Sequence, residues 1–186
     1  MRYLADFDEL HVMAATMLEE YTEEEIVENI LNILRVAYIR GKQKACEDLD
    51  WEWNDYLLFG DEDWEQEVIL KEIKGKNVID RIREHVQAND PDKLAVVIDT
   101  EYHRDFNTGE YDMAKYVDKQ SVTRVKKKWV TQMDDRVRDT HDYLLDMEVG
   151  MDDRFYTYDG DSARFPGDFT LAENNCGCRC YVEYTR

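Results

Sequence analysis

The stretch WVTQMDDRVRDTH, residues 129–141, decides how the last third of the chain folds. Its apolar opening predicts a short strand over residues 127–131, because strands favour aromatic and β-branched side chains. Asp134 then stands where a helix N-cap belongs, since its carboxylate can accept a hydrogen bond from a free amide of the first turn. A Pro-Gly loop and an alternating strand over residues 178–184 follow. This order predicts a small antiparallel sheet covered by a helix.

His141 is the first candidate for chemistry in this stretch. At helical spacing Val137, His141 and the leucines 144–145 share one face, which predicts a buried imidazole. A carboxylate or a main-chain group of the terminal strand would supply its hydrogen-bond partners, so a structural role is favoured. The catalytic alternative makes His141 a base that Asp134 or Asp168 orients. No nucleophile or substrate pocket accompanies these side chains in the sequence, and we expect no catalytic residue.

Three cysteines near the end of the chain are candidate metal ligands. Cys176, Cys178 and Cys180 alternate, so on a regular strand their thiols would form a column on one face. Tetrahedral zinc usually takes its ligand pairs from Cys-x-x-Cys turns, whereas Cys-x-Cys on an extended strand would hold the thiols too far apart for easy chelation. Buried free thiols are therefore the favoured interpretation. Zinc bound by two of these cysteines and His141 stays open as the alternative, and no other cofactor is expected.

The order of these motifs resembles the Mu F-like minor capsid proteins of the phage head morphogenesis family. That family repeats a Trp-x-Thr segment, an Asp-x-Arg-Val-Arg-x-x-His segment, a Pro-Gly-Asp loop and a terminal Asn-Cys-Arg-Cys. The matching residues here are Trp129, Thr131, Asp134, Arg136, Val137, Arg138, His141, Pro166, Gly167, Asp168, Cys178, Arg179 and Cys180. Two upstream elements also match, at residues 100–104 with Gly109 and at residues 37–41 with Ala45.

Two departures from the family pattern concern turns. Asp146 stands where the family usually has a small residue, most often glycine, after the His-x-x-Leu step. Cys176 and Gly177 separate Asn175 from the final Cys-Arg-Cys. The turn after the helix and the turn before the last strand therefore need not follow the family geometry.

The resemblance implies a minor component of a tailed-phage head. Such a protein acts with the portal protein and with other head or scaffold proteins during procapsid assembly. It is made in the cytoplasm of the bacterial host and can enter the virion head. Two alternatives from other classes stay open. One is a metal-dependent nuclease or toxin-like transferase that uses His141, Asp134 and the terminal cysteines, and the other is a dimerising interaction module.

Composition argues against nucleic-acid and membrane partners. With 43 acidic against 24 basic residues the net charge is -19, so phosphate backbones repel the protein and we expect no strong DNA binding by it alone. The one compact basic run, Arg124 with residues 126–128, is interpreted as a solvated face. No apolar run approaches the roughly 18 residues that cross a bilayer, so no membrane role is expected. Few cysteines and no N-terminal export pattern predict synthesis in a reducing compartment.

The upstream half of the chain is typical of amphipathic helices. Apolar spacing predicts helices over residues 4–21, 77–88 and 92–117, and Gly109 would allow the last one to break near residues 107–109. Thr22-x-x-Glu25 is a capping box that predicts the start of a further helix. That helix carries small residues at helical spacing, which would let another helix approach closely: Ala37, Gly41 and Ala45.

Two upstream features have both a functional and a structural interpretation: a charged trio in one helix and an aromatic, acidic stretch before it. Glu101, His103 and Arg104 lie within one helical turn, and at this density of charge a surface network is favoured over an acid-base site. Residues 46–75 hold several tryptophans among acidic side chains. They would form either a partner-binding surface or a loop folded back onto the helices. The tryptophans concerned are Trp51, Trp53 and Trp64.

The fold class that these patterns predict is α+β. An N-terminal helical layer precedes a small C-terminal antiparallel sheet that a helix covers. Residues 1–91 are expected to form the helical N-terminal region and residues 92–186 the Mu F-like core. At 186 residues the two parts are expected to make one compact unit.

Overall fold

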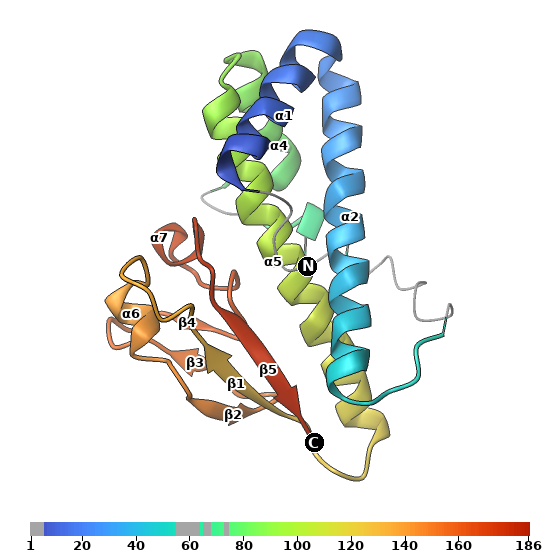
Figure 1. The fold of residues 1–186 in the computed structure, drawn as a ribbon, viewed down its shortest axis with the longest axis vertical. Coiled ribbons are helices and arrows are strands. Elements are labelled where there is room, and N and C mark those ends of the chain that lie inside the picture. The colour runs from blue at the N-terminus through green and yellow to red at the C-terminus, as the bar shows by residue number, and fades with distance from the viewer. Residues whose placement is uncertain (1–5, 55–63, 65–67, 73–74) are drawn as a thin grey trace.

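The computed structural model describes residues 6–54, 64, 68–72 and 75–186. Four long helices make a helical layer: α1 (Phe7–Glu20), α2 (Glu23–Asp48), α4 (Val78–Gln87) and α5 (Pro91–Gln120). A small sheet region built from the rest of the chain lies beside the lower half of α5 (Figure 1). The predicted α+β class is confirmed.

The helices begin where the sequence provides caps. Thr22 and Glu25 form the predicted capping box, in which the Thr22 amide donates to the Glu25 carboxylate at 2.8 Å. A second box, between Asn77 and Asp80, starts α4. Asp90 caps α5 directly before Pro91, whose missing N–H costs nothing at a helix start. The predicted cap signals placed the starts of α2 and α5 within a few residues of their positions.

Helices α2 and α5 cross at two glycines. A Cβ added to Gly41 would lie 2.0 Å from the carbonyl oxygen of Phe106, and one added to Gly109 would lie 2.0 Å from that of Tyr38. Each glycine therefore admits the backbone of the other helix. The expectation of a break near residues 107–109 is wrong, because α5 runs unbroken from Pro91 to Gln120 and Gly109 serves the crossing instead.

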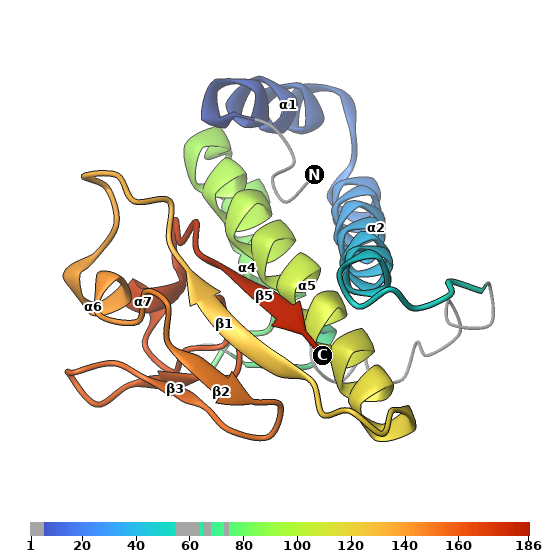
Figure 2. The same cartoon turned by 60° about the horizontal axis from the view of Figure 1, so that its bottom comes forward.

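The three-stranded sheet has the order β2-β1-β5, with both pairings antiparallel. Its strands are β1 (Lys126–Val130), β2 (Glu148–Gly150) and β5 (Tyr181–Thr185), and a separate hairpin joins β3 (Phe155–Tyr156) to β4 (Ser162–Ala163). Trp129 on β1 pairs with Val182 on β5, as the predicted pairing of the two strands requires. Strand β5 lies nearest to α5 and β2 lies on the far side (Figure 2).

The prediction of a helix that starts at Asp134 is wrong, because the helix observed here starts later and is shorter. The Asp134 Oδ1 atom accepts from the Arg136 amide at 3.1 Å, so its carboxylate closes a tight turn instead of capping a helix. The helix that follows is the single turn α6 (Asp139–Asp142), with Arg138 in the N-cap position. A similar short helix, α7 (Ala172–Asn175), precedes the cysteines. Both lie at the edge of the molecule away from α2 (Figure 1).

The turn after α6 explains one departure from the family pattern. Asp146 has φ 60°, a left-handed conformation that glycine adopts without cost and that aspartate tolerates better than most residues. Its amide donates to the Trp129 carbonyl at 2.9 Å, which holds the turn against β1. Asp146 thus adopts the backbone conformation that a glycine would adopt at this turn.

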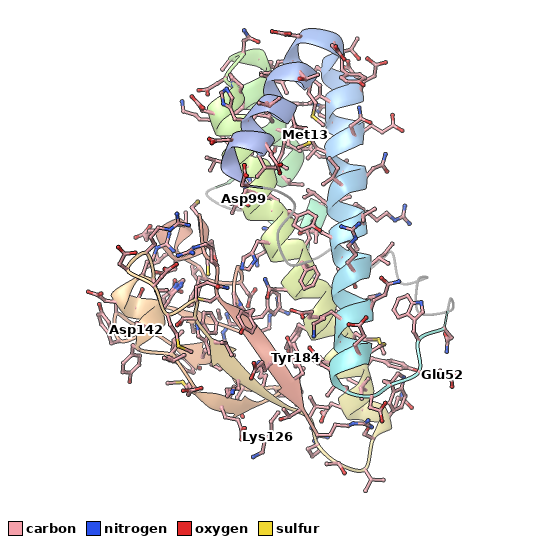
Figure 3. The ribbon with its side chains drawn as sticks, viewed as in Figure 1. Met13, Glu52, Asp99, Lys126, Asp142 and Tyr184 are labelled. Carbon is pink, nitrogen blue, oxygen red and sulfur yellow. The ribbon has the colours of Figure 1, made fainter. Side chains whose placement is uncertain are left out.

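Two buried clusters share α5 as their common wall. The first lies among α1, α2, α4 and the N-terminal half of α5, and includes Ile98, Tyr102 and Phe106. The second lies between the C-terminal half of α5 and the sheet, where Tyr184 of β5 is buried (Figure 3). Because one helix contributes to both clusters, the helical layer and the sheet region are packed together.

The tryptophans of residues 46–75 differ in burial. Trp64 is only 6% exposed and packs in the first cluster, so the expectation that it lies on an exposed binding surface is wrong. Trp51 and Trp53 are half-buried against the second cluster, and Trp51 meets Tyr116 edge-on at 6.4 Å between ring centroids. The remainder of the acidic stretch, at 55–63, 65–67 and 73–74, lies outside the described residues.

Candidate functional site

His141, Cys178 and Cys180 converge behind the sheet. The Nδ1 atom of His141 lies 3.6 Å from Cys178 Sγ and 3.5 Å from Cys180 Sγ. All three ligand atoms lie within 4.8 Å of one another, and their side chains are 1%, 4% and 3% exposed. The inward orientation predicted for His141 is confirmed. Its partners are sulfur atoms, where the sequence had indicated a carboxylate or a main-chain group.

An apolar shell encloses this trio, which we call the His-Cys cluster. The ring of Phe169 stacks on the imidazole of His141 with centroids 5.0 Å apart, and Trp129 meets it edge-on at 5.8 Å. Trp129 belongs to β1 and is fully buried, so the strand side closes the cluster to water. The Nε2 atom of His141 is buried and has no hydrogen-bond partner among the described residues.

A second histidine reaches the cluster from α5. The imidazole of His103 is buried and hydrogen-bonds the Cys178 sulfur. The Cys180 thiol, then His103 and His141, stabilise a thiolate at Cys178, which outweighs burial and lowers the pKa of Cys178 well below its usual range. The same contact with Cys178, together with burial, raises the pKa of Cys180. The surroundings of the two sulfurs therefore favour ionisation of Cys178 over ionisation of Cys180.

The expected column of three cysteines does not form. Cys176 is exposed at the end of α7, where it lines a groove of about 530 Å³ with Ala172 and Val96. Gly177 then turns the chain with φ 63°, and Cys178 and Cys180 lie before β5 rather than on it. The interpretation that Cys-x-Cys separates its thiols too widely is also wrong, because this segment is not a regular strand.

Asp134 is engaged away from His141. The guanidinium of Arg179 donates to both Asp134 oxygens, at 2.8 and 2.5 Å. Those hydrogen bonds lower the pKa of Asp134, although burial opposes them slightly. Arg138 reaches the carbonyl of Cys176. Arg179 and Arg138 thus hold the turn before α6 against the segment that carries the cysteines. The described contacts do not join Asp134 to His141 as an acid-base pair.

The Pro-Gly-Asp loop carries a buried carboxylate with three cationic partners. Asp168 accepts from the Arg164 side chain at 3.0 Å on each oxygen, from Lys71 at 3.0 Å and from Arg154 at 3.3 Å. Burial alone would raise the pKa of Asp168, but Arg164 and Lys71 outweigh it and hold that pKa far below its usual range. Asp168 is the centre of an ion cluster, not an orienter of His141.

Gly167 places this loop directly on α5. Its φ of 94° is one that glycine adopts readily, and a Cβ there would lie 3.0 Å from the Arg104 Cα. Arg104 in turn forms an ion pair with Glu101 at 2.6 Å, and Arg81 of α4 donates a hydrogen bond to the same carboxylate at 2.6 Å. Burial opposes ionisation of Glu101, but the two arginines outweigh it and lower its pKa.

The surface charge network expected at Glu101, His103 and Arg104 is therefore wrong, because all three side chains are buried. Glu101 and Arg104 pair inside the protein, and His103 serves the His-Cys cluster. The residues that sequence reasoning missed are Lys71, Arg81, His103, Arg154 and Arg164. Only His103 had a signal, as one of a charged trio on one turn, but nothing local connects it to cysteines more than seventy positions away.

The basic run that leads into β1 and opens it has its exposed charges matched by carboxylates. Arg124 pairs with Asp118 at 2.9 Å, and Lys126 pairs with Glu148 at 2.7 Å. Lys128 pairs with Glu183 at 2.8 Å. Lys127 instead points inward and donates to three main-chain carbonyls, those of Met151, Asp153 and Arg164. The run is a solvated face at three positions and a buried cation at the fourth.

Lys127 predicts a pH effect on stability. Burial, then the nearby Arg164 and Arg154, lowers its pKa to about 8, against about 10.4 for an unfolded lysine. Between these values the unfolded state binds one more proton, so stability rises with pH by up to about 1.4 kcal/mol per unit. Relative to Lys127→Met, the wild type should therefore gain stability from pH 8 to 10 in urea unfolding. Lys126→Met, at the exposed neighbour, should show no such slope, and parallel profiles for Lys127→Met would contradict the assignment.

Comparison with known proteins agrees with the arrangement of these motifs. The family described as Phage Mu protein F like protein matches residues 67–183, which contain the His-Cys cluster and the Asp168 ion cluster. The minor head protein GP7 of Bacillus phage SPP1 is 29% identical over 92 residues, which are 50% of this chain and 29% of that protein. The NAD(+)--arginine ADP-ribosyltransferase EFV of Enterococcus faecalis (strain ATCC 700802 / V583) is 41% identical over 56 residues, 30% of this chain and 11% of that protein.

The chain spans less than a third of the length of either relative. No solved structure matches it. The family match nevertheless covers more than half of the 186 residues, and it contains every motif from Thr100 to Cys180 on which the predicted resemblance rests. The chain belongs to the phage Mu protein F like family.

Proposed function

We propose that this protein is a minor head protein that acts with the portal and with scaffold or other head proteins during procapsid assembly. The observation that carries the proposal is the family match over residues 67–183. The partial similarity to the minor head protein GP7 supports the same assignment. On this proposal the protein is made in the cytoplasm of the bacterial host and enters the virion head.

The partner surface proposed here is the end of α2. Trp51 and Trp53 line a groove of about 440 Å³ together with Gln43, Glu47 and Asp50. Half-buried tryptophans are typical of the anchor positions of protein interfaces. A partner that contributes basic and apolar side chains would complement this groove.

The experiment is co-expression with the portal protein of the same phage, followed by affinity capture. The wild type should retain the portal, and Trp51→Ala with Trp53→Ala should reduce the amount retained while the melting temperature stays near that of the wild type. Tyr156→Ala removes an exposed aromatic on β3 and serves as the matched control. Undiminished capture by the double variant would refute the surface, and no capture by the wild type would refute the portal as partner.

The enzyme alternative finds no support in the described contacts. Asp134 is bound to Arg179 at the surface, and Asp168 is bound by three cations, so neither orients His141. The similarity to the ADP-ribosyltransferase EFV covers only 11% of that protein.

In the described part of the chain, no helix has the length and apolarity that crossing a bilayer requires.

We also predict that the protein alone does not bind duplex DNA appreciably. The net charge of -19 opposes approach, and the cations at Arg124, Lys126 and Lys128 are matched by carboxylates. Fluorescence anisotropy with labelled duplex at about 0.15 M salt should show no saturable binding. Micromolar binding that disappears when Arg124, Lys126 and Lys128 are neutralised would contradict this prediction.

A further inference from the structure

We propose that the His-Cys cluster binds a structural zinc ion through Cys178 Sγ, Cys180 Sγ and His141 Nδ1, with the His103 imidazole as the fourth ligand. Two thiolates and two imidazoles are a donor set that zinc takes in tetrahedral structural sites. The inference is independent of the role in head assembly, because it rests on the geometry of His141, Cys178 and Cys180. His103 is assigned as the fourth ligand because its imidazole hydrogen-bonds the Cys178 sulfur.

The distances within the cluster match a zinc tetrahedron. With zinc bonds of about 2.3 Å to sulfur and about 2.0 Å to nitrogen, a tetrahedral site has nitrogen-to-sulfur edges of about 3.5 Å. The two edges from His141 Nδ1 measure 3.6 Å to Cys178 and 3.5 Å to Cys180. An ion at the centre of the cluster would therefore reach His141 and both sulfurs without displacing the backbone.

Hydrogen bonding alone satisfies these groups poorly. One imidazole nitrogen faces two sulfurs, and thiols are weak donors and acceptors. The other nitrogen of His141 has no partner in the described part of the chain. A buried imidazole with only two weak contacts is costly unless something stronger holds it, and a metal bond at Nδ1 would supply that interaction.

Electrostatics and enclosure favour a structural role for the ion. Two thiolates neutralise Zn²⁺, so the occupied site would carry no net charge among the rings of Trp129 and Phe169. With the three ligands of the trio at most 4% exposed, the ion has no open position for a substrate water.

The position of the ligands shows what the ion would hold together. His103 belongs to α5, His141 to α6, and the two cysteines to the segment that leads into β5. Zinc would act as a cross-link between the long helix and the last strand, in a region where regular strands are short.

The direct test uses the whole chain, purified under reducing conditions. Elemental analysis should find about one zinc ion per chain. After removal of zinc with a chelator, titration with Co²⁺ should produce a cobalt-thiolate charge-transfer band in the near ultraviolet and strong visible bands of a tetrahedral complex. This measurement needs no variant. A protein without zinc that also gives no thiolate band with Co²⁺ would overturn the proposal.

Variants then assign the ligands. Cys178→Ser, Cys180→Ser and His141→Ala should each abolish the tetrahedral cobalt spectrum. His103→Ala should keep the thiolate band but weaken zinc affinity by more than about 100-fold, since even contacts outside the ligand set are worth 10- to 100-fold. Cys46→Ser is the matched control, because Cys46 is equally buried but lies on α2 and does not belong to the group of close metal-ligand atoms formed by His141, Cys178 and Cys180. Cys176→Ser is the exposed control.

Two outcomes separate the proposal from its alternatives. Zinc content and cobalt spectrum unchanged in His103→Ala would show a three-residue site and remove His103 from the ligand set. Full zinc loading of Cys178→Ser or Cys180→Ser, or loss of zinc in Cys176→Ser, would show that the metal is bound elsewhere. Addition of a chelator to the wild type should lower the melting temperature, and zinc, but not magnesium, should restore it.

Discussion

Asp168→Asn is expected to lower the free energy of unfolding by about 3 kcal/mol. Removing one partner of a buried ion pair costs about 3 to 5 kcal/mol, because the remaining charge stays without compensation. Asp168 is 5% exposed, whereas Arg164, Arg154 and Lys71 keep between 25% and 34% of their side-chain surface in water. Their partial hydration places the expected loss at the lower end of that range. Urea unfolding at pH 7 measures it.

The control for this variant is Asp134→Asn. It makes the same chemical change at an exposed carboxylate that also binds an arginine with two hydrogen bonds. Exposed ion pairs contribute little, so we expect almost no change in stability. Equal losses in the two variants would show that burial does not decide the strength of the Asp168 cluster.

The stabilisation by Asp168 should depend on pH in a defined direction. Its folded pKa lies below the value of about 3.9 of an unfolded aspartate, so in acid the unfolded state binds the proton first. The difference in stability between wild type and Asp168→Asn is therefore full above about pH 5 and shrinks as the pH falls below 4. A difference that stays constant down to pH 3 would contradict this assignment.

Gly109→Ala is expected to destabilise the protein by about 3 kcal/mol or more. In an open helix, alanine is favoured over glycine by roughly 1 kcal/mol. At this position the new Cβ would lie 2.0 Å from the Tyr38 carbonyl oxygen and 2.9 Å from its carbon, so the backbone of α2 would have to move away. Overpacking costs about 1 to 3 kcal/mol where side chains can adjust, and a main-chain obstacle adjusts least.

Glu28→Ala provides the comparison for Gly109→Ala, because it leaves the same alanine side chain at a helix position on the exposed face of α2. Its free energy of unfolding should stay close to that of the wild type. Gly41→Ala should repeat the large loss, since its Cβ would meet the Phe106 carbonyl at the reciprocal contact. A thermal melt in which Gly109→Ala matches or exceeds the wild type would show that α2 and α5 can separate at little cost.

Local signals in the sequence predicted most helix starts. Thr22 with Glu25, and Asp90 before Pro91, act on amides within the same turn, so their effect is visible without knowledge of the fold. Asp134 shows the limit of this reasoning. The same carboxylate can close a turn two residues on or cap a helix, and the Arg179 guanidinium, which comes from the far end of the chain, holds it in the turn.

Burial of charge was the feature that sequence could not predict. Glu101 and Arg104 look like surface residues because ionised side chains rarely lie inside, and the pattern around them is dense in charge. Their burial depends on Arg81 of α4 and on the loop at Gly167, which approach α5 only in the folded protein. The same holds for His103, whose partner Cys178 is distant in sequence.

The two core clusters on α5 set a lower limit on the length of a fragment that can be studied alone. The family match begins at residue 67, but α1 and α2, which cover the apolar side of α5, lie before it. A truncated protein that starts at the match would expose Ile98, Tyr102 and Phe106 to solvent and should aggregate when expressed. Crystallisation or binding work that needs a shorter protein would therefore keep α1 and α2 and shorten the chain elsewhere.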